Sequence, residues 1–142
     1  MNFLVIANFK SHKTKADILE WQKQVAYRLP ELGGVSAIFC PPIPYLDLYV
    51  PSVLQLGAQD VSPYPAGSYT GAVNADQLKE FGVKYAILGH SERRRYFHET
   101  AQDVSSKVRE LLSVGITPLV CMERDQIAPQ FSSLDDEYLD RC

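Results

Sequence analysis

The chain of 142 residues has few cysteines and no long hydrophobic run. Its three cysteines, Cys40, Cys121 and Cys142, are an odd and widely spaced set, which fits neither a disulfide framework nor a zinc cluster. Cys40 and Cys121 each end an apolar run, and we expect both to be buried as small hydrophobic side chains. No apolar stretch approaches the roughly 18 residues that a membrane helix needs, so the sequence predicts no transmembrane segment and no membrane partner.

The chain also has little net charge. Fourteen Lys and Arg residues against seventeen Asp and Glu residues leave a net charge of −3, which argues against nucleic acid as a partner. We therefore expect the short basic run at residues 93–95 to form structural ion pairs, with Arg93 paired to Glu99, rather than a nucleic-acid patch.

The amino terminus lacks the features of a secretory signal. Its apolar run has no basic region before it and no small-residue cleavage site after it, so we expect a cytoplasmic protein. Hydrophobic residues at 46% and charged residues at 22% are typical of a globular protein rather than a disordered one. The length predicts a single domain over residues 1–142.

Five short apolar runs, rich in β-branched and aliphatic residues, recur along the chain. None of them alternates strictly between apolar and polar residues, a pattern typical of strands buried on both faces of a parallel sheet. The runs cover residues 3–7, 37–40, 53–58, 85–88 and 116–121.

Helical patterns fall between most of these runs. The expected capping residues are Thr14, Asn74 and Thr100, and the residues expected to end the three helices are Pro30, Gly82 and Gly115. Pro44 predicts a shorter helix that runs through Val50 and is broken by Pro51. Strands that alternate with helices predict an α/β fold with right-handed crossovers. The pattern alone does not separate an open doubly wound sheet from part of a barrel.

Polar residues follow the apolar runs, at the carboxyl ends of the predicted parallel strands, where α/β proteins build their sites. They are Asn8, Lys10, Gln59, Asp60, His90, Ser91, Glu92 and Glu123. Asn8 and Lys10 are expected in an extended segment with their side chains on one side. A lysine at this edge suits an anionic substrate. A neutral His90, where the chain turns into a helical segment, can donate a hydrogen bond to a substrate oxygen.

The stretch Leu-Gly-His-Ser-Glu-Arg-Arg at residues 88–94 is long and highly specific. With residues 8–10, 57–64, 67–73 and 118–123, it resembles the triosephosphate isomerase family over residues 3 to about 124. The resemblance implies the TIM (β/α)8-barrel fold, here as a partial barrel of about five parallel strands with intervening helices. It also implies interconversion of dihydroxyacetone phosphate and glyceraldehyde 3-phosphate through an enediol, without a cofactor, in glycolysis and gluconeogenesis.

The resemblance assigns roles to four polar residues. His90 would polarise the substrate carbonyl and move protons between the two oxygens, and Lys10 would bind the substrate and stabilise developing negative charge. Asn8 would contact the substrate or position Lys10. Glu92 would lie beside Lys10 at the catalytic site, although a carboxylate in the first turn of a helix is favourable in any case. No metal site is expected, and His12 and His98 are expected at the surface.

Residues 62–73 form a segment too long for a simple strand-to-helix turn, and long ordered loops are usually functional. In the family that the chain resembles, this loop inserts into the neighbouring subunit, which implies a homo-oligomer with Tyr69 and Thr70 at the subunit interface. An ordinary surface loop would explain the glycine, proline and tyrosine content nearly as well.

The sequence departs from the family pattern at several places. Phe9 stands where tryptophan is usual, and Met122 stands where glycine is usual, which is expected to crowd the barrel mouth at Glu123. A complete barrel needs about 250 residues. No segment resembles the sixth strand with the family's catalytic glutamate, the lid or the phosphate-binding loops. The acidic residues Asp135, Asp136, Glu137 and Asp140 are expected on the solvated face of a helix after Ser133.

These departures lead to two hypotheses. In the first, the isolated chain has little or no isomerase activity, because it lacks a general base, and becomes active when a second polypeptide supplies the remaining strands. The strand edges of such a partial barrel would be exposed and would favour association. In the alternative, the chain is a non-catalytic fragment or assembly module that retains site residues.

Overall fold

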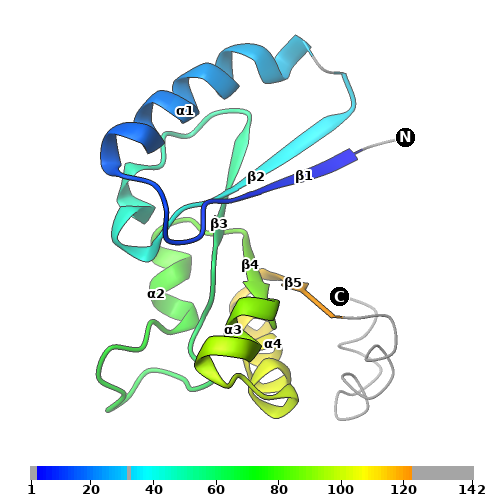
Figure 1. The fold of residues 1–142 in the computed structure, drawn as a ribbon. Helices are drawn as coiled ribbons and strands as arrows, with labels where there is room; N and C mark the ends of the chain where they lie inside the picture. The colour runs from blue at the N-terminus through cyan, green and yellow to red at the C-terminus, as the bar shows by residue number, and fades with distance from the viewer. Residues whose placement is uncertain (1–2, 32, 123–142) are drawn as a thin grey trace.

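The computed structural model describes residues 3–31 and 33–122. These residues form five parallel strands in the order β1-β2-β3-β4-β5. The strands span Phe3–Asn8 (β1), Val35–Cys40 (β2), Leu54–Ala58 (β3), Tyr85–Leu88 (β4) and Thr117–Val120 (β5). The sheet curls, with β1 and β5 at its two ends (Figure 1). The expected partial barrel with intervening helices is therefore confirmed, and the strand bounds differ from those predicted by at most two residues.

Helices connect the strands and lie outside the curl. They span Lys15–Arg28 (α1), Ala75–Glu80 (α2), Ser91–Phe97 (α3) and Ala101–Val114 (α4), with 3-10 turns at Leu29–Glu31 (η1) and Ile43–Leu48 (η2). Thr14, Asn74 and Thr100 cap α1, α2 and α4 as predicted, each accepting from the backbone N–H three residues on. In Figure 1, α1 lies over β1 and β2, and α3 and α4 lie at the other end of the sheet.

The short helix predicted from Pro44 is present, but it ends before Val50. The segment is a 3-10 helix, η2, with a non-helical Tyr45, and the backbone becomes extended at Tyr49. The physical reason for the early end is Pro51, which disfavours helical backbone at Val50, whereas Pro44 lies in the first turn, where a missing N–H costs no helical hydrogen bond.

Apolar side chains on the two faces of the sheet form separate clusters. The larger cluster packs the sheet against the helices, and its fully buried members include Phe39, Leu56, Leu88, Val108 and Leu111. On the other face, Ile38, Cys40 and Ile87 pack together. Gly57 faces this smaller cluster, where an added Cβ would lie 2.5 Å from the Cys40 Sγ. The expected burial of Cys40 is confirmed, whereas Cys121 is only partly buried.

Three aromatic rings join β1 to α1 and β2. Trp21 of α1 stacks on Phe39 of β2 with ring centroids 5.6 Å apart. Phe9, directly after β1, meets the Trp21 ring edge-on at 4.8 Å and the Phe39 ring at 5.2 Å. The ring of Phe9 thus fixes the start of the β1–α1 loop against the core.

Strand β1 is not buried on both faces, contrary to the prediction for the apolar runs. Phe3 is 59% exposed, Leu4 49%, Val5 51% and Ile6 43%. Among the described residues, β1 pairs with β2 alone. Within the described part of the chain, one edge of β1 has no paired strand, and the apolar side chains of residues 3–6 are exposed on both faces.

Candidate active site

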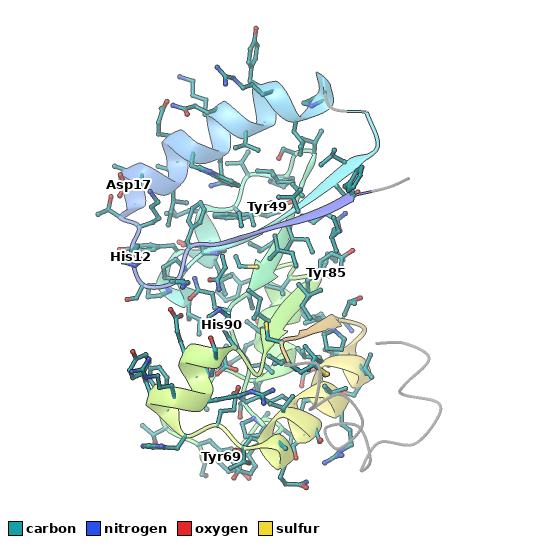
Figure 2. The ribbon with its side chains drawn as sticks, turned by 45° about the vertical axis from the view of Figure 1, so that its right-hand side comes forward. His12, Asp17, Tyr49, Tyr69, Tyr85 and His90 are labelled. Atoms are coloured by element: carbon teal, nitrogen blue, oxygen red, sulfur yellow. The ribbon has the colours of Figure 1, made fainter. Side chains whose placement is uncertain are left out.

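Polar side chains gather at the carboxyl ends of β1, β3 and β4, as the sequence predicts. They line a cavity of about 260 Å³ whose walls include Asn8, Lys10, Gln59, His90 and Glu92. Figure 2 shows His90 at the start of α3, near the loop that carries His12. The four residues that the family resemblance singles out therefore line one cavity.

The backbone turns sharply at Lys10 and does not stay extended, contrary to the prediction. Lys10 has a φ of +50°, in the left-handed region, and its N–H donates to the Asn8 Oδ1 at 2.9 Å. Its ammonium group reaches across to α3, where Nζ lies 2.7 Å from Glu92 Oε1. Asn8 therefore positions Lys10, and Glu92 lies beside Lys10 as the resemblance implies.

His90 caps the amino-terminal end of α3 with its imidazole ring. The Nδ1 atom accepts a hydrogen bond of 3.2 Å from the Glu92 N–H. An imidazole nitrogen that accepts carries no proton, so the ring proton of the neutral form resides on Nε2. This tautomer leaves Nε2–H as a donor for an oxygen atom in the cavity.

Gly89 makes the turn that presents His90. It has a φ of +64°, and an added Cβ would lie 3.0 Å from the Cys121 carbonyl oxygen. Arg94 fastens the turn, because Nε donates to the Gly89 carbonyl and Nη2 donates to the Cys121 carbonyl, both at 2.8 Å. The strand-to-helix turn is thus tied to the end of β5.

Lys10 and Glu92 form a half-exposed ion pair at the mouth of the cavity. The hydrogen bond from Lys10 lowers the pKa of Glu92 below its usual range, so this side chain is a carboxylate at neutral pH. The carboxylate balances the ammonium charge and fixes its direction while leaving it open to solvent.

A network of two carboxylates and two cationic side chains, Asp60, Glu99, Arg93 and Lys107, extends from the cavity wall into the protein interior. Lys107 and Glu99, whose side chains are 4% and 2% exposed, form an ion pair. Asp60 bridges the two bases, at 2.7 Å from Lys107 Nζ and 2.8 Å from Arg93 Nη2. The predicted pair of Arg93 and Glu99 is confirmed at 3.1 Å. Burial raises the pKa of Asp60, and the two neighbouring cations oppose that rise.

The network also holds the site turn, because Glu99 Oε2 accepts from the Gly89 N–H at 3.0 Å. Sequence reasoning assigned Lys107 no role. A signal was present, since Lys107 shares the buried face of α4 with Val104, Val108 and Leu111. A lysine on an apolar face needs a buried acid as its partner.

The long loop after β3 is exposed at its tip. Tyr69 and Thr70 are both exposed, and the Tyr69 ring stacks on Tyr64 with centroids 4.6 Å apart. The Ser62 N–H donates to the Val73 carbonyl at 2.8 Å and closes the loop at its base. Figure 2 shows Tyr69 far from His90.

His12 and His98 are exposed, as expected. Within residues 3–31 and 33–122, no group of three or more His, Cys, Asp or Glu side chains could hold a metal ion. None of the helices in the same ranges is long and apolar enough to cross a membrane. Glu123 and the acidic residues after Ser133 lie outside the described residues.

Comparison with known proteins places this arrangement in a family. The family model described as triosephosphate isomerase matches residues 3–133. The triosephosphate isomerase of Thermus thermophilus is 42% identical over 123 residues, covering 84% of this chain and 49% of the relative. That of Polynucleobacter asymbioticus is 38% identical, covering 96% of this chain and 64% of the relative.

A solved structure agrees with the sequence relatives. The crystal structure of triosephosphate isomerase from Bartonella henselae superposes with a TM-score of 0.84 and 26% identity, covering 96% of this chain and 63% of that one. The chain spans about half the length of the relatives from Thermus thermophilus, Xanthomonas campestris and Symbiobacterium thermophilum. The motifs, the curled parallel sheet and these matches together show that the chain belongs to the triosephosphate isomerase family.

Proposed function

We propose that this chain forms the carbonyl-polarising part of a triosephosphate isomerase and is completed by a second polypeptide. The observation that carries the proposal is the convergence of Lys10, His90 and Glu92 in one cavity, with Lys10 Nζ 2.7 Å from Glu92. The reaction is the interconversion of dihydroxyacetone phosphate and glyceraldehyde 3-phosphate, in glycolysis and gluconeogenesis in the cytoplasm.

The proposed roles follow from the contacts. His90 Nε2–H donates to the substrate carbonyl oxygen, because Nδ1 is already occupied by the Glu92 N–H. As a base removes the carbon-bound proton, negative charge develops on that oxygen, and the ammonium group of Lys10 stabilises it. His90 then moves a proton between the two oxygens of the enediol, and reprotonation at the neighbouring carbon completes the exchange.

The base is proposed to come from the second polypeptide. A general base must lie within hydrogen-bonding reach of the proton that it removes. The two carboxylates that line the cavity, Asp60 and Glu92, are already paired with cations. Neither is therefore suited to the task.

The exposed side of β1 supports such a partner. Residues 3–6 present four exposed apolar side chains next to an edge of the sheet. A groove of about 830 Å³ runs along α1 and is lined by Trp21, Gln24 and Tyr27 among others. A strand followed by a helix would pair with the edge and bury these apolar groups.

A homo-oligomer through the loop tip is a separate proposal. Tyr69 and Thr70 are exposed and stand on a loop closed at its base. Sedimentation of the completed assembly should give twice the mass of one pair of chains, and Thr70→Arg should return it to one pair. An assembly of a single pair in the parent protein would contradict this proposal.

The test of the proposed function is complementation. The chain is mixed with the part of the Thermus thermophilus relative that the match does not cover, and isomerisation is followed with each triose phosphate. We expect turnover from the mixture and little or none from either part alone. Lys10→Ala should abolish turnover without preventing the complex, whereas Lys13→Ala, an exposed lysine of the same loop, should leave turnover unchanged.

Two outcomes separate the hypotheses. A complex that forms but shows no turnover would favour the non-catalytic assembly module. Turnover that survives Lys10→Ala would overturn the role given to Lys10.

A further inference from the structure

We propose that Gln59 is a positioning residue that holds Lys10 in its left-handed conformation. Gln59 follows β3, lines the cavity and is partly buried. Its Nε2 amide donates to the Lys10 carbonyl and to the Cys40 carbonyl, each at 3.0 Å. One amide group thus ties the loop that carries Lys10 to the end of β2. The inference rests on the proposed function, because it concerns how that site holds its lysine.

Lys10 needs to be held because its conformation is unfavourable. A side chain with a Cβ rarely adopts a positive φ, and such strain persists only where the surroundings fix it. Lys10 is fixed at three atoms: its N–H by Asn8, its carbonyl by Gln59 and its Nζ by Glu92. The three partners come from the ends of β1, β3 and β4, so the lysine is oriented by three separate elements.

The two carbonyl acceptors determine which side chain can do this. A carboxamide nitrogen carries two N–H donors and can serve both oxygens at once. Glutamate would place a carboxylate against two carbonyl oxygens, and asparagine is one methylene shorter. Cys40 O also accepts from the Phe9 N–H at 3.1 Å, so Gln59 and the residue next to Lys10 share one anchor point.

The test is amide hydrogen exchange on the 142-residue chain by NMR. In Gln59→Met we expect the Phe9 and Lys10 amides to exchange about tenfold faster, the change expected when a hydrogen bond of ordinary strength is lost. The matched control is Gln55→Met, within β3 itself, which removes the same kind of amide four residues earlier and should leave both rates unchanged. If Gln59→Met does not fold, Gln59→Asn provides the same readout.

Unchanged exchange at Lys10 in a folded Gln59 variant would overturn the inference. A second readout uses the completed assembly, where Gln59→Met should lower kcat/KM about tenfold and Gln55→Met should not. If the parent assembly shows no turnover, the proposed function fails while the exchange rates still decide the role of Gln59.

Discussion

The β1 end of the sheet and the region around β4, toward its other end, are built from the same kinds of residues and differ in what surrounds them. At the β4 end, Leu88 of the strand and Val108 of α4 are fully buried, and a closed network of charges lies behind the turn. At the β1 end, Leu4 and Ile6 belong to an equally apolar strand but are exposed. The burial of a strand is therefore determined by its neighbours and not by its own composition.

The candidate site spans these two ends. Lys10 stands on the loop after β1, whereas His90 and Glu92 stand on the turn after β4. The ion pair of Lys10 with Glu92 and the hydrogen bonds of Gln59 link the ends across the mouth of the cavity. The geometry of the candidate site thus depends on the less covered end remaining in place.

The largest effect is expected from breaking the charge network at the covered end. Lys107→Met leaves the buried carboxylate of Glu99 and the partly buried carboxylate of Asp60 without one of their cations, which should lower the free energy of unfolding by about 3–5 kcal/mol. Urea denaturation followed by circular dichroism measures the loss. Lys79→Met, on the exposed surface of α2, is the control and should change stability by less than about 0.5 kcal/mol. Equal stability of the two variants would contradict the role of the network.

The next largest effect is the difference in stability lost when two leucines of the same sheet are each replaced by alanine. Leu88→Ala removes a fully buried side chain and should cost about 2–5 kcal/mol. Leu4→Ala removes one that is 49% exposed, and its cost should be well below that of Leu88→Ala. After a second polypeptide is bound, Leu4→Ala should instead weaken the complex. Equal costs in the isolated chain would show that β1 is covered in solution.

A smaller change in stability is expected from relieving the backbone strain at Lys10. Lys10→Ala and Lys10→Gly both remove the ion pair with Glu92, but only glycine adopts a positive φ without a Cβ penalty. Lys10→Gly should therefore be more stable than Lys10→Ala by about 1 kcal/mol. Thermal unfolding of the two variants measures the difference. Identical stabilities would mean that the left-handed conformation is not retained in solution.

The smallest effect concerns the cap of α4 and its pH dependence. Hydrogen bonds from Thr100 lower the pKa of Asp103 below its ordinary value of 3.8. A carboxyl group whose pKa is lower in the folded than in the unfolded chain stabilises the fold at pH values above the unfolded pKa. This stabilisation is lost as the pH falls through the folded pKa. Thr100→Ala should cost about 1 kcal/mol at neutral pH.

Part of the stability cost of Thr100→Ala should disappear in acid, at pH values below 3.8, where the Asp103 carboxylate becomes protonated. The rest should remain, because the hydrogen bond from the Asp103 N–H to Thr100 is independent of pH. Thr14→Ala at the start of α1 should also lower stability less in acid than at neutral pH, because hydrogen bonds from Thr14 lower the pKa of Asp17. Denaturation at several pH values measures both. A difference that is constant through the acid range would contradict the pKa assignment.

The sequence predicts the strands, the three capped helices and the grouping of the site residues, because each depends on local chemistry. Thr100 and Gly115 mark the ends of α4 without any knowledge of tertiary structure. The exposure of β1 and the left-handed backbone at Lys10 could not be predicted in this way. Both depend on contacts between distant segments, as does the bond between Lys107 and Asp60, which are 47 residues apart.

The aromatic group beside the β1–α1 loop gives the chain an intrinsic optical reporter. The sequence has one tryptophan, Trp21, and its ring contacts Phe9, the residue that precedes Lys10. Trp21 also lines the groove along α1. Its fluorescence emission therefore originates at the end of the molecule where a partner would bind. Selective excitation of this indole would follow assembly and loop movement in real time, without a label.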